Sequence, residues 1–318
     1  FLMNESSRIY IAGHNGLVGS AIKRKLTSLG YKNILLKTRQ ELDLLNLRDV
    51  KSFFKKESPE YVIIAAAKVG GILANRDYPA DFIYENLVIQ NNLINTSYEN
   101  GVKNLIFLGS SCIYPKTSNQ PIKEEYLLTS SLEETNRSYA IAKISGIEMC
   151  WSYNRQYGTK YLALMPTNLY GLNDNYNLQN SHVLPALIRK IHEAKINHSK
   201  TIEVWGTGKP KREFLISDDF ADAAVFLLKN IDQIDIFNDF HPPLINVGSG
   251  EDISIKELVS LISKILQFDG EFIFDHSKPD GVNRKLLDIS KMKEYGWEPK
   301  IKLPQGILTV YNDYKNNF

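Results

Sequence analysis

The sequence has little cysteine, little net charge and no long hydrophobic run. Two cysteines among 318 residues cannot build a disulfide framework, so we expect a reducing compartment, with the cytoplasm as the default. The 38 lysines and arginines nearly balance the 36 aspartates and glutamates, which argues against a nucleic-acid or membrane-surface binder. No apolar run approaches the roughly 20 residues of a membrane span; Lys68 ends one of the longest, Tyr61–Ala67. The first residues lack the charged and apolar regions of a signal peptide.

Short apolar segments alternate with longer amphipathic ones through the first half of the chain. The segments expected to form strands are Arg8–Ala12, Asn33–Lys37, Tyr61–Ala67, Asn104–Leu108 and Lys160–Pro166. The segments expected to form helices are Leu17–Leu29, Leu47–Lys56, Ala80–Asn100 and Tyr139–Tyr157. This alternation predicts the α/β class, with a doubly wound parallel sheet of the Rossmann type.

The alternation becomes less regular after Tyr170. Residues 170–183 are polar and predict a long functional loop. We expect residues 1–170 to form a dinucleotide-binding domain, to which residues 217–247 return. Residues 171–318 should form mainly a second, smaller α/β lobe that binds the substrate. Two such lobes would leave a crevice for a ligand between them.

The segment GHNGLVG places Gly13, Gly16 and Gly19 between the first expected strand and the first expected helix. The first glycine permits a tight turn, the second lets a pyrophosphate approach the helix N-terminus, and the third lets helix and strand pack closely. A glycine triplet alone can be a simple strand–helix turn. Its position in the first unit of an α/β chain favours a dinucleotide site.

The end of the second expected strand indicates which dinucleotide binds. An NAD site usually has an acidic residue there for the ribose hydroxyls, but this chain has Lys37 and Arg39. A guanidinium matches phosphate geometry, so these residues favour NADP, used as NADPH. The alternative is that both are solvated surface charges, since Glu41 and Asp43 are close in the sequence.

Two motifs together indicate proton transfer. The segment YAIAK puts Tyr139 and Lys143 four residues apart, on one face of a helix. An ammonium favours a neighbouring phenolate, so we expect Lys143 to lower the pKa of Tyr139. Ser110, in LGSSCIYP at the end of an expected buried strand, could orient a substrate carbonyl against the phenol. Tyr-x-x-x-Lys alone is common by chance, but the glycine loop and the serine argue against a chance match.

A glycine loop, a serine and Tyr-x-x-x-Lys together resemble the extended short-chain dehydrogenase/reductase family. Motifs along nearly the whole chain strengthen the resemblance: IAGHNGLVGSAI, AAAKVGGI, YPADFIYEN, LGSSCIYPK, YAIAKISGI, SYNRQYG, MPTNLYG, NSHVLPAL, KREFL and KPDGVNRKLLD. They are most similar to members that act on GDP-linked sugars. The resemblance implies epimerisation of GDP-4-keto-6-deoxy-D-mannose at carbons 3 and 5, followed by reduction of carbon 4 with NADPH to give GDP-L-fucose.

The resemblance implies a role for Cys112 and His182, which match the family's acid–base pair. Protons on carbons 3 and 5 flank a ketone, and inverting each centre needs one base and one acid. Without the resemblance, a lone free cysteine or histidine is more often structural. Either residue could be the base. Cys150 follows Tyr139 by about 16 Å along the same helix, at about 1.5 Å per residue, and we interpret it as a core residue.

The resemblance also implies which residues form the site. The expected catalytic residues are Ser110, Cys112, Tyr139, Lys143 and His182. The expected cofactor-binding residues are Gly13, His14, Asn15, Gly16, Leu17, Val18, Gly19, Arg39, Leu108, Gly109, Ser110, Ser111, Lys143, Pro166, Thr167, Asn168, Leu169 and His182. The expected substrate-binding residues are Lys190, Trp205, Arg212, Asp280 and Lys285. No metal site is expected.

Two positions depart from the family pattern. Asn15 stands where the family often has an arginine for the NADP phosphate, so Arg39 must carry more of that contact. Lys190 stands where arginine is frequent, which exchanges a planar fork of donors for a point charge.

The partners expected are the GDP-sugar and a second copy of the chain, without nucleic acid or membrane. The homodimer would pair the two long helices, residues 80–100 and 139–157, with their symmetry mates. Two other functions stay open. One is a nucleotide-sugar epimerase or dehydratase with recycled NAD, although such relatives usually lack the cysteine after the serine pair. The other is a non-catalytic dinucleotide-binding regulator, although these tend to lose the tyrosine or the lysine.

Overall fold

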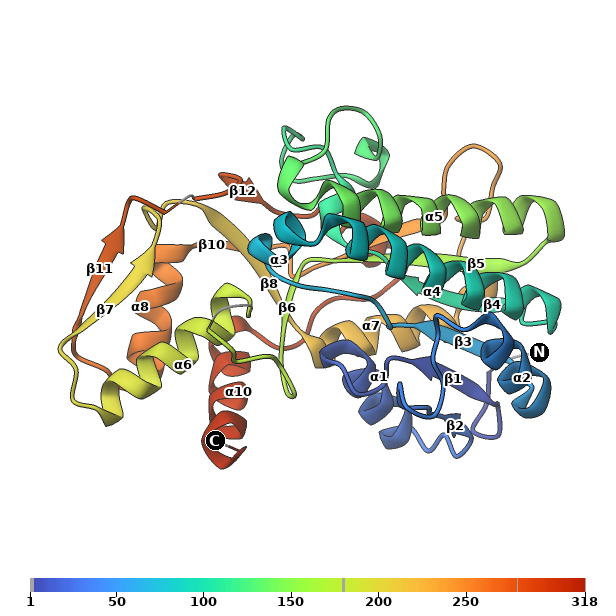
Figure 1. The fold of residues 1–318 in the computed structure, drawn as a ribbon, viewed down its shortest axis with the longest axis horizontal. Helices are drawn as coiled ribbons and strands as arrows, with labels where there is room; N and C mark the ends of the chain where they lie inside the picture. The colour runs from blue at the N-terminus through green and yellow to red at the C-terminus, as the bar shows by residue number, and fades with distance from the viewer. Residues whose placement is uncertain (1–2, 179–180, 279, 318) are drawn as a thin grey trace.

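The computed structural model describes residues 3–178, 181–278 and 280–317, and its centre is a six-stranded parallel sheet (Figure 1). Along the sheet the strands are β2 (Ile34–Leu35), β1 (Ile9–Ala12), β3 (Tyr61–Ile64), β4 (Asn104–Leu108), β5 (Lys160–Pro166) and β9 (Leu244–Val247). Each neighbouring pair is parallel. The chain order reverses between β1 and β3. In doubly wound sheets, ligands bind beyond the carboxyl ends of the strands at such a point.

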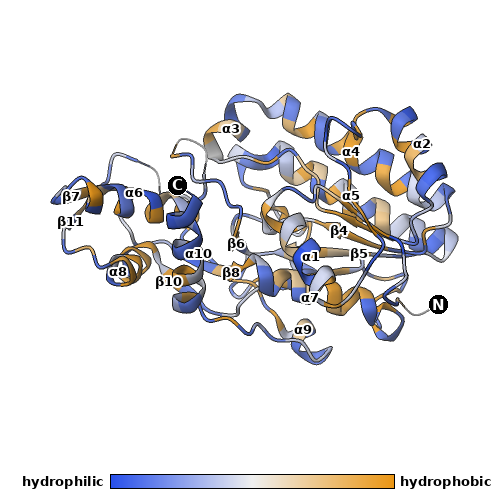
Figure 2. Cartoon of the chain, turned by 90° about the horizontal axis from the view of Figure 1, so that it is seen from below, coloured by the Kyte–Doolittle hydropathy of each residue, from blue (hydrophilic) through white to orange (hydrophobic). Residues whose placement is uncertain are grey.

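Helices cover both faces of this sheet. One layer consists of α1 (Leu17–Ser28) and α7 (Ser217–Lys229), and the other of α2 (Leu47–Glu57), α4 (Pro79–Glu99) and α5 (Arg137–Tyr157). Side chains alternate along a strand, so each face has its own apolar core. Ile9 and Ile11 pack with the first layer, whereas Tyr10 and Ala12 pack with the second. Figure 2 shows the apolar residues concentrated on the central strands and on the helix sides that face them.

The second lobe has a core of its own. Its helices are α6 (Val183–Ile196), α8 (Ile255–Leu266) and α10 (Leu303–Asn317), and one small sheet pairs β7 (Thr201–Trp205) with β11 (Glu271–Asp275). In another sheet, β8 (Lys211–Ile216) pairs with β6 (Asn168–Tyr170), β10 (Asp252–Ser254) and β12 (Arg284–Lys285). Only Thr167 separates β5 from β6, so the chain passes directly from the central sheet into this second lobe.

Short elements complete the chain. These are α3 (Ile72–Asp77), α9 (Ser290–Glu294) and the 3-10 turns η1 (Ser111–Ile113), η2 (Glu124–Tyr126), η3 (Glu134–Asn136) and η4 (Ile231–Gln233). In the part of the chain that the structure describes, no helix is long and apolar enough to cross a membrane.

The structure confirms the expected α/β class and the doubly wound parallel sheet. Strands β4 and β5 have the expected bounds, but β2 is shorter than expected. It lies at the sheet edge, where only Ile34 and Leu35 are in register with β1. Strand β3 ends at Ile64 instead of Ala67, because its partner β1 ends at Ala12 and turns away at Gly13.

Candidate active site

The loop between β1 and α1 has the geometry that a pyrophosphate needs. Gly13 has a φ of +86°, and a Cβ there would lie 2.7 Å from the backbone nitrogen of Ala66, so this turn requires glycine. A Cβ on Gly19 would overlap the carbonyl oxygen of Gly13, so glycine also permits the close approach of α1 to the turn. Gly16 is the N-cap of α1 and makes no side-chain cap. The first amides of the helix are therefore open to an anion.

Charged residues after β2 lie beside this loop. Glu41 accepts hydrogen bonds from the backbone nitrogen and the hydroxyl of Thr38, both at 2.8 Å, and its Oε1 lies 3.8 Å from Lys37 Nζ. Burial and nearby Lys23 lower the pKa of His14 in the glycine loop, and the charge of Glu41 opposes this shift. Arg39 is exposed on the same turn. Its guanidinium is thus free to meet a phosphate, while Lys37 is engaged with Glu41.

The carboxyl end of β4 carries the serine and the cysteine. Ser110 is the N-cap of η1, and its Oγ accepts a hydrogen bond of 3.4 Å from the backbone nitrogen of Cys112. The same hydroxyl faces the phenol of Tyr139 and the thiol of Cys112. Ser110 therefore stands between a thiol from the β4 loop and a phenol from α5.

Lys143 on α5 forms a hydrogen bond with the end of β4. Its Nζ donates a hydrogen bond of 2.7 Å to the carbonyl oxygen of Leu108, the last residue of the strand. The ammonium lies 5.8 Å from the ring centroid of Tyr139 and 4.9 Å from that of Phe107. Burial lowers the pKa of Lys143 from 10.5 to about 8. A buried cation with a lowered pKa at strand ends is typical of a functional site.

The expectation that Lys143 lowers the pKa of Tyr139 is wrong in this structure. Burial raises the pKa of the phenol, the negative charge of a Cys112 thiolate adds to the shift, and the hydroxyl of Ser110 opposes it. The physical reason is that the lysine points its amine at the carbonyl of Leu108, while the phenol is desolvated against neighbours such as Phe82, 6.3 Å away between ring centroids. Tyr139 is therefore protonated at neutral pH.

Cations surround the thiol of Cys112. Burial raises its pKa, and the positive charge of Lys285, the hydroxyl of Ser110 and the positive charge of Lys143 oppose the shift in that order. His182 is the N-cap residue of α6, at the end of the polar loop. Surrounding protein atoms lower its pKa, and Lys285 lowers it further. The structure thus brings Cys112 and His182 into the field of one lysine.

Strands β8 and β12 each carry a half-buried cation, Arg212 on β8 and Lys285 on β12. Arg212 and Lys285 are paired in the parallel register of these strands. Arg212 donates a hydrogen bond of 2.6 Å to the carbonyl oxygen of Val282. Burial lowers the pKa of both cations. The negative charge of a Cys112 thiolate raises the pKa of Lys285, and the positive charge of Arg212 lowers it. Lys285 is therefore partly desolvated, and it lies within the electrostatic range of both Arg212 and Cys112.

The remaining expected substrate residues are Trp205 at the end of β7, Lys190 on α6 and Asp280 after β11. Trp205 is 53% exposed, and the ammonium of Lys190 lies 5.8 Å from its ring centroid. Asp280 accepts hydrogen bonds from the backbone nitrogen and the hydroxyl of Thr207, at 2.6 and 2.7 Å. Lys278, which sequence reasoning missed, lies 5.5 Å from the ring centroid of Trp205. No pattern around Lys278 distinguishes it from a surface lysine.

The other expected cofactor residues cluster at the carboxyl ends of β4 and β5, which are adjacent strands. They are Leu108, Gly109, Ser111, Pro166, Thr167, Asn168 and Leu169. Thr167 and Asn168 point polar groups at the backbone of β8, because both donate to the carbonyl oxygen of Glu213, at 3.2 and 2.8 Å. Cys150 is fully buried in the core between the sheet and α5, as expected.

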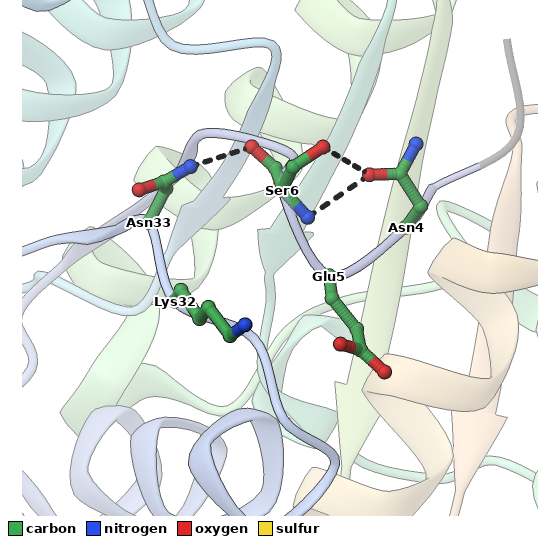
Figure 3. A pocket seen from close by; sticks show the side chains of 5 residues that line it. All are labelled: Asn4, Glu5, Ser6, Lys32 and Asn33. Carbon is green, nitrogen blue, oxygen red and sulfur yellow. Dashed lines mark hydrogen bonds between the residues drawn. The ribbon is translucent and has the colours of Figure 1, made fainter.

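A surface hollow lies at the opposite end of the sheet. Its lining residues precede β1 and β2 and are Asn4, Glu5, Ser6, Lys32 and Asn33 (Figure 3). All five are exposed and polar, and Asn33 donates to the carbonyl oxygen of Ser6 at 2.7 Å. The amino ends of parallel strands are not where α/β sheets bind ligands. We therefore place the site at the carboxyl ends, where the titratable groups gather.

This arrangement of residues defines the class of protein. An open helix N-terminus for a pyrophosphate, and a serine, tyrosine and lysine at the ends of adjacent strands, are the parts of a dinucleotide-dependent oxidoreductase of sugars or alcohols. The positive charge of Arg212 and Lys285 next to these parts suits a phosphorylated substrate.

Comparison with known proteins identifies the family. The NAD dependent epimerase/dehydratase family matches residues 9–248. GDP-L-fucose synthase 1 of Arabidopsis thaliana is 54% identical over 99% of this chain and 95% of its own length, and GDP-L-fucose synthase of Escherichia coli is 49% identical over 98% and 97%. The chain belongs to the NAD dependent epimerase/dehydratase family and, within it, to the GDP-L-fucose synthases.

A solved structure of another GDP-sugar enzyme has the same fold. The GDP-mannoheptose C4 reductase MlghC from Campylobacter jejuni, solved with NADP bound, is 45% identical with a TM-score of 0.90. The alignment covers 98% of this chain and 99% of MlghC.

Proposed function

We propose that this chain converts GDP-4-keto-6-deoxy-D-mannose to GDP-L-fucose, by inverting carbons 3 and 5 and reducing carbon 4 with NADPH. The observation that carries the proposal is that one hydroxyl, Ser110, faces both the phenol of Tyr139 and the thiol of Cys112. A simple reductase needs only the serine, the tyrosine and the lysine. The thiol adds a second proton-transfer group beside the same carbonyl. The names of the related GDP-L-fucose synthases support this substrate.

NADP fits the nucleotide side of the site. The open amides at the start of α1 would hold the pyrophosphate, and the exposed Arg39 would hold the extra phosphate of NADP. The NADP bound to MlghC supports this choice. Bound NADPH supplies the hydride for carbon 4.

Reduction of a ketone requires a proton donor at its oxygen. Tyr139 supplies that proton, and the hydroxyl of Ser110 holds the oxygen beside it. The raised pKa of the phenol keeps Tyr139 in the protonated form that this step consumes. Lys143 orients α5 on the strand end and contributes positive charge beside the oxygen as charge develops there.

Epimerisation uses the same carbonyl before it is reduced. Hydrogen bonds from Ser110 and Tyr139 to the carbonyl oxygen stabilise the enolate that forms when a neighbouring carbon loses its proton. Cys112 and His182 are the pair that removes this proton and returns one to the opposite face. Their shared neighbour Lys285 favours the thiolate of Cys112 and disfavours a charged His182.

The second lobe holds the GDP group in this proposal. Arg212 and Lys285 bind the diphosphate, since they are half-buried cations and Lys285 lies within the electrostatic range of Cys112. The base lies by the exposed ring of Trp205, with Lys190 at its edge, and Asp280 contacts the nucleoside. Residues 171–318 are thus mainly a substrate lobe, and residues 1–170 with 217–247 mainly a cofactor domain.

We also propose a homodimer in the cytoplasm. Helices α4 and α5 lie side by side, joined by a hydrogen bond of 2.7 Å from Gln90 to the carbonyl oxygen of Ala142. Tyr84 on α4 is 65% exposed, and pairing both helices with their symmetry mates would cover it. The two free, buried cysteines suit a reducing compartment. Light scattering at micromolar concentration should give the mass of a dimer, and a monomer there would refute the pairing.

The decisive assay supplies NADPH and GDP-4-keto-6-deoxy-D-mannose and follows both the nicotinamide absorbance and the product. We expect one NADPH oxidised per sugar and an L-fucosyl product. Oxidation that yields only the uninverted 6-deoxysugar would indicate a C4 reductase, the activity in the name of MlghC. Turnover without net oxidation would indicate an epimerase or dehydratase with recycled NAD, and no turnover would leave a binding protein.

A further inference from the structure

A buried carboxylate stands directly beside the substrate-binding arginine. Glu213 in β8 has no exposed surface. Its Oε1 accepts a hydrogen bond of 2.7 Å from the backbone nitrogen of Gly250, and its Oε2 accepts one of 2.9 Å from that of Leu287. Among the described residues, no cation forms an ion pair with it. Burying a carboxylate costs several kcal/mol unless hydrogen bonds compensate, so its presence needs a reason.

The surroundings of Glu213 accept only a carboxylate. Backbone nitrogens can only donate, and they approach both oxygens of the side chain. A glutamine of the same size would turn its NH₂ group toward one of these donors. Burial raises the pKa of Glu213, while hydrogen bonds from Leu287, Gly250, Thr167 and the backbone of Ser249 oppose that shift. The site is built for an ionised acid.

Glu213 connects three segments that belong to different parts of the molecule. Gly250 lies in the turn that follows β9 of the central sheet. Leu287 comes two residues after Lys285 of β12. The backbone carbonyl of Glu213 accepts from Thr167 and Asn168, at the exit from β5. One residue thus ties the cofactor sheet to both substrate strands.

A further contact shows how tightly the carboxylate is held. A Cβ on Gly248 would overlap Oε1 of Glu213, so the turn after β9 wraps directly around the acid. Side chains alternate along β8, so Arg212 leaves the strand on the other side and donates to the carbonyl oxygen of Val282. Glu213 and Arg212 are thus neighbours in β8 that make their contacts on opposite faces of the strand.

We propose that Glu213 is a positioning residue that places Arg212 and Lys285 against the cofactor sheet, so that the diphosphate of a GDP-sugar is held with its carbonyl at Ser110 and Tyr139. This inference rests on the proposed function. Loss of the carboxylate should loosen β8, β12 and the turn after β9 relative to each other. The cations would remain in the lobe, but their geometry toward a diphosphate would be lost.

The test compares Glu213→Gln with a matched control. Asp219 is also buried, and its Oδ2 accepts from the backbone nitrogens of Lys300 and Ile301, at 2.9 and 2.8 Å, in the segment that precedes α10. We expect Glu213→Gln to raise the Kd for GDP at least tenfold and the KM for the sugar nucleotide likewise, with the Kd for NADPH within twofold. Asp219→Asn should lower the melting temperature and leave both affinities within twofold. If Glu213→Gln does not fold, Glu213→Asp is compared with Asp219→Asn instead. Aspartate keeps both carboxylate oxygens but withdraws them by one methylene from the backbone nitrogens.

The outcomes separate this inference from the proposed function. GDP affinity within twofold of the unmodified protein in folded Glu213→Gln overturns the positioning role. Equal losses of GDP and NADPH affinity overturn it too, because they indicate general loosening. If the unmodified protein does not bind GDP, the proposed function fails and this inference fails with it.

Discussion

Replacing Lys143 by methionine should make the cofactor-free protein more stable at neutral pH while it abolishes reduction. Lys143 is 3% exposed, and burial lowers the pKa of its ammonium from 10.5 to about 8. The folded state therefore binds this proton less tightly than the unfolded state does. The buried charge destabilises the fold, and methionine removes it at similar length.

The sign and size of the effect follow from linkage. Below pH 8 the lysine is charged in both the folded and the unfolded state, and the full destabilisation by the buried charge applies. This destabilisation decreases as the pH rises from 8 to 10.5 and is absent above pH 10.5. At about 1.4 kcal/mol per pKa unit, the penalty is about 3 kcal/mol. Methionine leaves the carbonyl of Leu108 without its 2.7 Å donor, which costs about 1 kcal/mol. The variant should thus gain about 2 kcal/mol at pH 7 and lose about 1 kcal/mol at pH 10.5.

Urea unfolding without cofactor, followed by circular dichroism at both pH values, measures this difference. Lys32→Met, at an exposed lysine, controls for the general effect of removing a charge. A stability difference between wild type and Lys143→Met that is the same at pH 7 and pH 10.5 would refute the reasoning. NADPH oxidation by Lys143→Met should fall at least a hundredfold, as is usual when proton transfer loses its positioned groups.

Two further predictions concern the cofactor and the proton donor. Arg39→Ala should raise the Kd for NADPH at least tenfold, because a charge-assisted hydrogen bond is worth about 1.5–3 kcal/mol, and leave that for NADH nearly unchanged; equal losses for both would show that Arg39 is structural. Tyr139→Phe should slow reduction of carbon 4 by about 10²–10⁴ with GDP affinity intact; reduction at the wild-type rate would remove Tyr139 from its role.

Features that rest on local sequence patterns could be predicted. The bounds of β4 and β5 follow from apolar runs that are buried on both faces of the sheet. The glycine loop follows from the spacing of its glycines, because a Cβ added at Gly13 or Gly19 would overlap backbone atoms. Edge strand β2 was predicted too long because its length depends on the partner β1, which no local pattern encodes.

The site was predictable only where its residues are neighbours in sequence. Tyr139 and Lys143 share a helix face, which the sequence predicts. The pKa shift of the phenol, however, depends on its burial and on the lysine donating to the carbonyl of Leu108, which is 35 residues from Lys143 in the sequence. The field of Lys285 on Cys112 arises from the pairing of β12 with β8. Glu213 was hidden inside KREFL, because only the fold reveals that backbone nitrogens from two distant segments meet its carboxylate.

The roles of Cys112 and His182 stay predictions, and one measurement tests the first of them directly. Cys112→Ser nearly keeps the volume of the side chain but replaces a thiol by a far weaker acid. The variant retains Ser110, Tyr139 and Lys143, so its capacity to transfer hydride to a 4-keto sugar should persist.

Deuterium uptake from heavy water at carbons 3 and 5 of GDP-4-keto-6-deoxy-D-mannose, measured by mass spectrometry and NMR, separates the two half-reactions. If Cys112 moves these protons, Cys112→Ser should lose the uptake while slow NADPH oxidation continues and yields the uninverted deoxysugar. Uptake at the wild-type rate would contradict the account, because the thiol would then be a packing residue and epimerisation would need another group.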